Sequence, residues 1–290
     1  MENLEVKTKN LMKKYGIRAN KSLGQNFLIN EEVVNSIVEA SNITTDDLVI
    51  EIGPGLGTLT ESLLENAGKI IAIELDERML EILNDRFKIN SNFEVINEDV
   101  LKVDLAELIM NEKRSNNLKS AKIVANLPYY ITTPIIMKLL EEELDIESIT
   151  VMIQKEVADR LIAIPGDKLS GAITYSVYYY AESESVMIVD NNSFIPEPEV
   201  QSEVIRLKIR KEPIVNPKDK EMFFKLIKVS FMQRRKTLMN SLVNGGIFAN
   251  KGQAAEVFAK LGFDANIRGE NLTINDFVIL SDEIIKLKNK

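Results

Sequence analysis

The sequence predicts an α/β domain built on a parallel sheet, followed by a smaller helical domain. Short, unbroken apolar runs alternate with segments of helical spacing, and the runs lie at residues 48–52, 70–73, 93–96, 123–125 and 149–153. A glycine-rich turn follows the first run, and only helical spacing recurs in the last part of the chain. Such alternation is typical of parallel strands whose two faces are covered by helices.

The expected elements divide the chain into three segments. Residues 1–20 are expected to form a flexible basic arm, residues 21–210 a ligand-binding domain and residues 211–290 a helical domain. Two prolines and alternating charges interrupt the pattern between Arg210 and Pro217, where we place the boundary. Further strands are expected at residues 172–181, 185–189 and 204–209, and C-terminal helices at residues 223–231, 235–242 and 276–287.

Composition restricts the chemistry. The chain has 290 residues with no Cys and no His, which excludes disulfides, thiolate catalysis and the commonest general base and metal ligand. We therefore expect no metal, and a reaction in which a cofactor supplies the activated group. No apolar run is long enough to span a membrane, and the Lys-rich N-terminal segment has no apolar signal core. The expectation is a soluble, cytoplasmic monomer.

Charge is distributed unevenly along the chain. The net charge is −8, but residues 1–204 carry 19 Lys and Arg against 35 Asp and Glu, whereas residues 205–290 carry 17 against 9. A second basic cluster opens the chain, at Lys7, Lys9, Lys13, Lys14, Arg18 and Lys21. This asymmetry indicates a polyanionic partner that contacts both ends of the chain. Solvated surface lysines are the alternative for either cluster.

A nucleotide-like ligand is indicated by the segment from Leu48 to Thr60, whose pattern is strand, tight turn and helix. Gly53, Gly55 and Gly57 let the backbone pass close to a ligand, and the start of the helix offers unpaired N–H groups. Turns of this kind serve nicotinamide, flavin and sulfonium cofactors alike, and some serve only packing. A phosphate-loop NTPase fits poorly, because no Lys-Ser or Lys-Thr follows the glycines.

Acidic residues follow the next two strands. Glu74 closes the second strand, 21 positions after Gly53, and Asp99 comes just after the third strand. An acid at the first of these places is expected to hold ribose hydroxyls, and we assign Asp99 to the exocyclic amine of an adenine ring. Isolated acids at strand ends are more often solvated, but their placement after successive strands favours binding.

The fourth strand runs into Asn126-Leu127-Pro128-Tyr129. Because Pro128 keeps Leu127 extended and donates no hydrogen bond, the chain is expected to leave the sheet as a stiff open loop. The Asn126 side-chain oxygen and the Leu127 carbonyl are two acceptors for one NH₂ group, and Tyr129 offers a flat face for an unstacked base. A packed Tyr in an ordinary strand-to-helix turn is the plainer alternative.

Taken together, these segments resemble one family, the ribosomal RNA adenine dimethyltransferases, and within it the small-subunit enzymes. The resemblance covers nearly the whole chain. It is carried by residues 21–28 (KSLGQNFL), 51–57 (EIGPGLG), 126–129 (NLPY), 194–202 (FIPEPEVQS), 231–238 (FMQRRKTL) and 268–272 (RGENL). In combination these motifs are highly specific.

The resemblance implies a Rossmann-like class I methyltransferase sheet with a smaller C-terminal helical domain. The implied activity is transfer of methyl groups from S-adenosylmethionine to the 6-amino groups of two adjacent adenosines. These lie in the hairpin loop near the 3′ end of 16S rRNA, in the small ribosomal subunit or its precursor. By family pattern, the cofactor site contains Asn26, Leu28, Gly53, Glu74, Asp99 and Asn126. Neighbouring positions expected there are Gln25, Glu51, Gly55, Gly57, Leu75 and Val100.

The resemblance also implies which groups act on the RNA. Asn126, Leu127 and Tyr129 would hold the target adenine, and Phe194 would be the second face of the base clamp. Phosphates of the rRNA would be bound by Lys13, Lys14, Arg18, Lys21, Arg234, Arg235 and Lys236. The last three are consecutive, so on a helix they cannot all face the RNA.

One segment departs from the family pattern, and other functions stay open. Residues 170–174 read Ser-Gly-Ala-Ile-Thr where the family usually has Tyr-Gly-x-Leu-Ser, which affects one local contact. A large-subunit rRNA methylase of the macrolide-resistance type shares the glycine and Asn-x-Pro-Tyr motifs, but residues 231–238 favour the small-subunit enzymes. A nicotinamide oxidoreductase would explain Glu74 but not residues 126–129. A mainly non-catalytic ribosome-assembly factor would use the same surfaces.

Overall fold

The computed structural model describes residues 3–20, 23–233 and 235–288. Contacts divide the chain into two compact units. The first comprises residues up to Ala158 together with Ser183–Ile209, and the second comprises Asp159–Glu182 together with the residues from Arg210 on. The chain passes between the units near Arg210, where the sequence placed a boundary. The chain also crosses from the first unit to the second before residue 159 and returns after residue 182, because residues 159–182 pack with the C-terminal helices rather than with the sheet.

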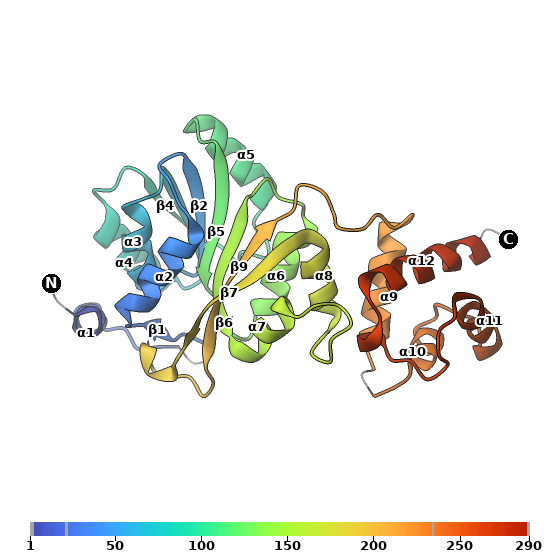
Figure 1. The fold of residues 1–290 in the computed structure, drawn as a ribbon. Helices are drawn as coiled ribbons and strands as arrows, with labels where there is room; N and C mark the ends of the chain where they lie inside the picture. Colours follow the sequence, from blue (N-terminus) through green and yellow to red (C-terminus); the bar gives the residue numbers. More distant parts are fainter. Residues whose placement is uncertain (1–2, 21–22, 234, 289–290) are drawn as a thin grey trace. The chain divides into compact units, whose positions relative to one another are not determined.

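Within the described residues, the first unit contains a seven-stranded sheet with the order β4-β3-β2-β5-β6-β9-β7 (Figure 1). The strands are β2 (Asp47–Ile52), β3 (Lys69–Glu74), β4 (Phe93–Asn97), β5 (Ser120–Asn126), β6 (Ser148–Gln154), β7 (Ala181–Val189) and β9 (Ser202–Ile209). Pairs from β4 to β6 are parallel, whereas β9 joins β6 antiparallel. The predicted parallel sheet is confirmed for these five strands. A separate ribbon pairs β1 (Phe27–Leu28) with β8 (Phe194–Ile195).

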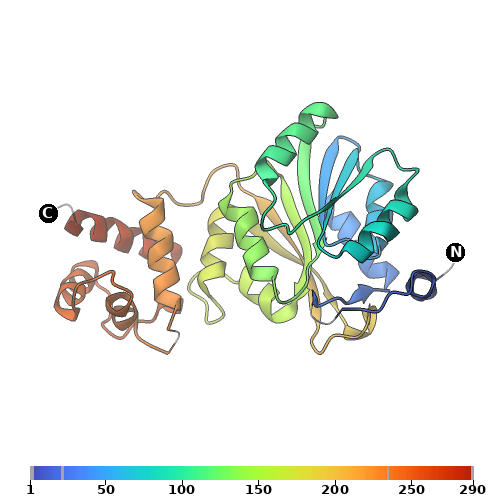
Figure 2. The same cartoon turned by 180° about the vertical axis from the view of Figure 1, so that it is seen from behind.

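Helices cover both faces of the sheet because both faces are apolar. On one face, Val49, Ile70 and Val124 form a core with α2 (Glu31–Ser41) and α3 (Thr58–Leu64). The helix α4 (Glu77–Phe87) lies on the same side, where the Phe87 ring packs against Phe93 of β4. On the opposite face lie α5 (Leu105–Ser115), which contacts β2 and β5, and α6 (Thr132–Glu141), as Figure 2 shows.

The N-terminal segment is not the flexible arm that the sequence suggested, because it forms α1 (Leu4–Lys14). Asn3 caps this helix by accepting a hydrogen bond from the Glu5 N–H at 2.8 Å. Two ion pairs hold it to the first unit: Lys7 Nζ lies 2.5 Å from the Glu61 carboxylate of α3, and Lys14 Nζ lies 3.0 Å from Asp85 of α4. A cluster of basic residues was therefore not sufficient evidence for a flexible arm.

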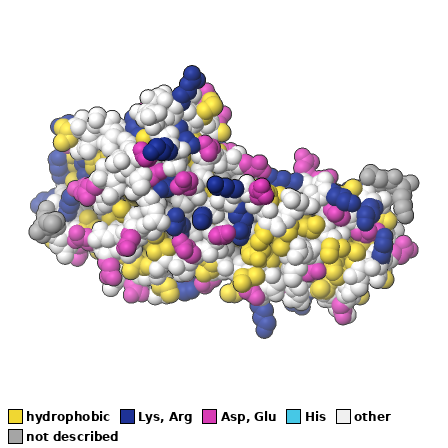
Figure 3. Space-filling model, turned by 45° about the horizontal axis from the view of Figure 1, so that its top comes forward, with side chains coloured by type: hydrophobic (Ala, Val, Ile, Leu, Met, Phe, Trp, Pro, Cys, Tyr) yellow, Lys and Arg dark blue, Asp and Glu magenta, His cyan; other side chains and the backbone are white. Residues whose placement is uncertain are grey.

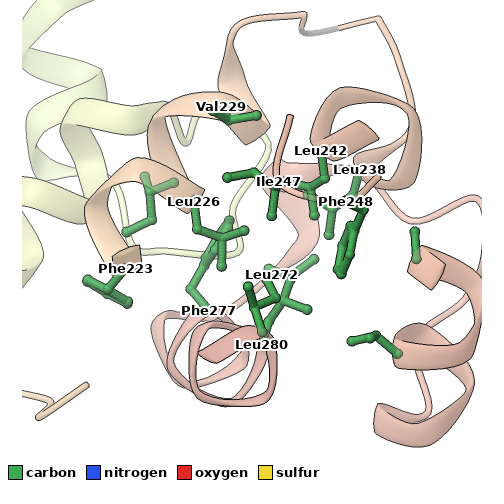
Figure 4. Close-up of a cluster of buried hydrophobic side chains, with 14 of the residues drawn as sticks. Phe223, Leu226, Val229, Leu238, Leu242, Ile247, Phe248, Leu272, Phe277 and Leu280 are labelled. Atoms are coloured by element: carbon green, nitrogen blue, oxygen red, sulfur yellow. The ribbon is translucent and has the colours of Figure 1, made fainter. Parts of the chain in front are cut away.

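The second unit is built from helices around one apolar core. These helices are α8 (Ala172–Tyr180), α9 (Lys220–Phe231), α10 (Leu238–Asn244), α11 (Lys251–Leu261) and α12 (Ile274–Lys288). Figure 4 shows the labelled side chains of α9, α10 and α12 pointing into a common interior. The helix α7 (Lys155–Ile162) begins in the first unit and ends in the second. No helix in the described ranges is long and apolar enough to cross a bilayer.

Two further expected elements differ from the structure, and hydrogen bonds explain both. Residues 172–180 were expected to be a strand but form a helix, because the Thr174 hydroxyl accepts from the Gly171 N–H at 2.9 Å and so caps the first turn. The β-prone Tyr175 and Tyr179 then lie on one helical face and are buried. The expected helix at 235–242 begins only at Leu238, because Thr237 caps it.

Candidate functional site

A cavity opens at the carboxyl ends of β2, β3 and β5, where ligands bind in open α/β sheets. Its volume is about 1150 Å³ with the open mouth included, enough for a nucleoside cofactor beside an unstacked base. The structure brings most of the predicted residues into its wall: Gln25, Asn26, Leu28, Glu51, Gly53, Gly55, Glu74, Leu75, Asp99, Val100, Asn126, Leu127, Tyr129 and Phe194. Gly57 is not among the wall residues.

The glycine turn after β2 has a backbone that other residues rarely adopt. Gly53, Gly55 and Gly57 have φ of 68°, 56° and 76°, in the left-handed region. A Cβ at Gly53 would meet no atom within 4 Å, so a side chain there would take up open space in the cavity. A Cβ at Gly57 would lie 2.6 Å from the Phe87 ring. Gly53 therefore keeps the cavity open, whereas Gly57 serves packing.

Backbone N–H groups orient the two acids that the sequence assigned to a nucleoside. Glu74 accepts from the Gly55 N–H at 3.1 Å and from the Asp76 N–H at 2.8 Å, one on each oxygen. Asp99 accepts from the Leu101 N–H at 2.9 Å through Oδ1, and no described residue donates to Oδ2. Because a carboxylate oxygen offers about two lone-pair sites, both acids keep capacity to accept. This suits ribose hydroxyls and an exocyclic amine.

Glu51 is a buried carboxyl group in the same wall. It is 1% exposed, and the Thr60 hydroxyl donates to its Oε2 at 2.6 Å. Burial, with a smaller contribution from the nearby Glu74 carboxylate, raises the pKa of Glu51 to about 8. Glu51 is therefore a neutral carboxylic acid at pH 7 in the protein without ligand.

The polar network around Asp76 was not foreseen from the sequence. Asp76 caps α4, forms a 2.5 Å ion pair with Arg78 and accepts from the Gln25 side chain at 2.8 Å. The Arg78 guanidinium holds the pKa of Asp76 below its ordinary value. An Asp directly before a helical pattern signals an N-cap. No local sequence pattern could indicate that Asp76 also accepts a hydrogen bond from the Gln25 side chain, which holds Gln25 near the end of β3.

The loop after β5 presents the acceptors that the sequence predicted. The Asn126 Nδ2 donates to the Asn26 carbonyl at 3.4 Å, and no residue in the described part of the chain donates to Oδ1. The Leu127 N–H donates to the Met152 carbonyl at 3.1 Å, and no described residue donates to the Leu127 carbonyl. The Tyr129 hydroxyl lies 2.6 Å from the Ser202 hydroxyl, which anchors the ring at its far end. Burial raises the Tyr129 pKa, so this hydroxyl stays neutral.

Phe194 and Tyr130 lie at the same loop but differ in exposure. Phe194 lines the cavity but is only 2% exposed. Tyr130, to which no role was assigned from the sequence, is 56% exposed and lines the cavity beside Gly24, where a Cβ would lie 3.3 Å from the ring. The sequence could have indicated this residue, because Tyr130 directly follows Tyr129. The role of Phe194 as a base clamp stays a prediction.

The residues expected to bind RNA lie outside the cavity wall. Lys21 and Arg234 fall outside the described residues. Lys14 is paired with Asp85, whereas Lys13 and Arg18 are exposed. Arg235 and Lys236 are exposed in the turn before α10, and neither has an ion-pair partner among the described residues. On the face drawn in Figure 3, Lys and Arg side chains lie among Asp and Glu rather than in one continuous patch.

The segment that departs from the family pattern closes a loop in the second unit. Ser170 is buried, and its hydroxyl donates to the Ile164 carbonyl at 2.9 Å. The Thr174 hydroxyl, four residues later, donates to the Arg160 carbonyl at 2.7 Å. Neither residue lines the cavity. The departure therefore leaves the cofactor and target-amine positions unchanged.

Comparison with known proteins identifies the family. Residues 16–286 match the family model described as ribosomal RNA adenine dimethylase. The chain belongs to this family. Its curated relatives include proteins named ribosomal RNA small subunit methyltransferase A. The one from Alkaliphilus oremlandii is 45% identical over 280 residues, covering 97% of this chain and 96% of the relative. The one from Clostridioides difficile is 46% identical over 278 residues, covering 96% and 94%.

Solved structures show the same fold. A dimethyladenosine transferase from Plasmodium falciparum is 28% identical, with a TM-score of 0.73, and covers 90% of this chain and 98% of that chain. The 23S rRNA methyltransferase ErmE is 24% identical, with a TM-score of 0.66, and covers 90% of this chain and all of that chain. The predicted Rossmann-like methyltransferase sheet is confirmed.

Family membership makes the protein an rRNA adenine dimethyltransferase that uses S-adenosylmethionine. The alternative of a nicotinamide oxidoreductase is therefore wrong. The wall residues fit the cofactor: Glu74 and Asp99 retain acceptor capacity for a nucleoside, Leu75 and Val100 offer apolar surface for a flat ring, and Gly53 leaves open space beside them. In the described part of the chain, no cluster of three or more acidic side chains could hold a metal ion.

The raised pKa of Glu51 predicts a pH effect on stability without ligand. Between the ordinary value of 4.5 and about 8, the folded state holds a proton that the unfolded state has lost. Stability therefore falls as pH rises through this window, by about 1.4 kcal/mol per pH unit. Between pH 5 and pH 8, Glu51→Gln should gain about 2–4 kcal/mol relative to the wild type. Urea unfolding at several pH values measures this; a constant difference would contradict it.

Proposed function

We propose that this protein dimethylates the 6-amino groups of two adjacent adenosines in the hairpin loop near the 3′ end of 16S rRNA. The observation that carries the proposal is the identity of 45–46%, over nearly the full length, with relatives named ribosomal RNA small subunit methyltransferase A. The match extends through the second unit, where residues 231–238 carry the small-subunit motif. The substrate is the small subunit or its precursor, and the enzyme acts as a cytoplasmic monomer.

The target loop supports the chemistry of methyl transfer to an amine. An adenine amine is a poor nucleophile, because its lone pair is delocalised into the ring. Asn126 Oδ1 and the Leu127 carbonyl lie on consecutive residues and accept from no described residue, so they would bind the two amine hydrogens. This favours a tetrahedral nitrogen with its lone pair available. Bound S-adenosylmethionine supplies the electrophilic methyl group.

Positioning by these residues replaces the need for a general base. The amine nitrogen becomes positively charged during transfer, so its proton is lost readily to water, and the absence of His is no obstacle. Tyr129, anchored through Ser202, would stack on the flipped base. The second transfer requires one acceptor, because a monomethylated amine retains one hydrogen.

One experiment tests the substrate directly. Labelled S-adenosylmethionine is incubated with unmethylated small subunits and, in parallel, with naked large-subunit rRNA, and the modified bases are mapped. Dimethyladenosine at two adjacent positions near the 3′ end of 16S rRNA is the expected result. Label in large-subunit rRNA alone would assign the protein to the resistance methylases instead.

Phosphate binding by the second unit is supported by an acid-free segment. No Asp or Glu occurs between Glu221 and Glu256. The described cations of this segment are all exposed, and none has an ion-pair partner among the described residues: Lys225, Lys228, Arg235, Lys236 and Lys251. Because these charges are not compensated locally, they are available to rRNA phosphates.

Arg235→Ala and Lys236→Ala should each weaken rRNA binding several-fold and by similar factors for different RNA sequences. Each should reduce the slope of log affinity against log salt by about 0.7–0.9, because one phosphate contact is lost. Filter binding at several salt concentrations measures both quantities. Lys119→Ala is the control, since Lys119 is exposed but lies 2.5 Å from Asp46. An unchanged salt slope in both test variants would remove these residues from the RNA surface.

A further inference from the structure

One aromatic side chain of the cavity wall is assigned neither to the cofactor nor to the target adenine. Of the aromatic side chains in the described part of the chain, Tyr130 alone is exposed. It is 56% exposed and lines the cavity. A single exposed apolar side chain is ordinary elsewhere on a protein surface. On the wall of a cavity that receives an unstacked base, however, an exposed ring offers a stacking surface.

The backbone fixes the position of this ring. The Ile131 N–H donates to the Pro128 carbonyl at 3.2 Å, which closes a turn with Tyr129 and Tyr130 as its two central residues. The Tyr130 ring contacts Gly24, where a Cβ would lie 3.3 Å from Tyr130 Cδ1. Because the turn and this contact hold the ring, little conformational entropy would be lost when a base stacks on it.

The two tyrosines of the turn differ in their surroundings. Tyr129 is partly buried, and its hydroxyl lies 2.6 Å from the Ser202 hydroxyl, so its ring is fixed in the wall beside Asn126 and Leu127. Tyr130 is exposed, and its hydroxyl has no hydrogen-bond partner among the described residues. Because consecutive Cα atoms are about 3.8 Å apart, rings on consecutive residues are within reach of consecutive bases of one unstacked strand.

We propose that Tyr130 stacks on the base next to the adenosine that occupies the cavity, and so keeps two neighbouring nucleotides unstacked during methyl transfer. The inference rests on the proposed function, in which the substrate contains two adjacent adenosines. It makes Tyr130 a residue that positions the RNA and not the cofactor. Because a bound strand has one polarity, the ring contacts the neighbouring base on one side of the target only.

Steady-state methyl transfer to unmethylated small subunits tests the contact. Tyr130→Ala should raise the KM for the subunits about 5- to 100-fold, while kcat and the Kd for S-adenosylmethionine each change by less than about 3-fold. Tyr130→Phe keeps the ring and should match the wild type. Met110→Ala, which removes an exposed side chain of α5 outside the cavity, is the control. An equal loss of cofactor affinity in Tyr130→Ala would show that the ring only supports the segment around Gly24, and would overturn the proposal.

Removal of the neighbouring base locates the contact. Small subunits are reconstituted with 16S rRNA that has an abasic nucleotide at the first or at the second target position, so that one adenosine remains as the target. Tyr130→Ala should lower kcat/KM for intact subunits and for one abasic substrate, but not for the other, in which the stacked base is already absent. Equal effects on all three substrates would overturn the proposal. No transfer by the wild type to intact subunits would instead overturn the proposed substrate.

Discussion

Asn126→Ala is expected to lower kcat by about 10²–10³-fold, while the Kd for S-adenosylmethionine changes by less than about 10-fold. The variant removes Oδ1, the acceptor that the Asn126 side chain presents once its Nδ2 is bonded to the Asn26 carbonyl. That acceptor matters most as the amine becomes positively charged, so its loss raises the barrier more than it weakens binding. Single-turnover methyl transfer and direct cofactor binding measure the two effects separately.

Two further variants show whether the acceptor or the local structure is responsible. Asn126→Asp keeps an acceptor but loses the donor to Asn26, so a partial recovery of rate over Asn126→Ala would identify the acceptor as the main contribution. Asn66→Ala removes an exposed amide whose one partner among the described residues is the Ser62 carbonyl, and it should leave turnover unchanged. Retained turnover in Asn126→Ala would refute the assignment. Equal losses of rate and cofactor affinity would leave Asn126 only its expected role in cofactor binding.

The cavity wall could be predicted from the sequence because its signals are local. Gly53, Glu74, Asp99 and Asn126 each come directly after an apolar run, and parallel strands bring their carboxyl ends to one edge of the sheet. Once the apolar runs were assigned to neighbouring strands, the sheet topology alone predicted that these residues lie close to one another. No knowledge of side-chain contacts was required.

What the sequence did not predict depends on partners distant in the chain. Asn20, Gln25 and Asp76 form a chain of hydrogen bonds that links the N-terminal segment to the end of β3, and no pattern of spacing reports it. Lys7 and Lys14 resemble free charges in the sequence but pair with Glu61 and Asp85.

The helix α8 was mistaken for a strand because Tyr and Val favour strands when no helical core is available to them. In the structure, burial of Tyr175 and Tyr179 against α9 overrides that preference.

Gly57→Ala is expected to destabilise the first unit by about 2–5 kcal/mol, although Gly57 does not line the cavity. An L-residue at φ 76° costs about 1–2 kcal/mol. The new Cβ would also lie 2.6 Å from the Phe87 ring and 3.0 Å from Leu83, and such overpacking costs about 1–3 kcal/mol. The Tm should fall by about 5–15 °C in the absence of cofactor. Differential scanning calorimetry of the variant measures this.

The backbone cost and the clash can be separated within the same turn. Gly53→Ala has nearly the same φ, 68°, but its Cβ would meet no atom within 4 Å, so it should lose only the backbone contribution in stability. In the Gly57→Ala background, Phe87→Leu should be less destabilising than in the wild type, because removal of the ring relieves the clash while its packing on Phe93 is lost. If the effects of the two substitutions on the free energy of unfolding were strictly additive, the clash with Phe87 would not cause the destabilisation. The left-handed backbone alone would then explain why glycine is required at position 57.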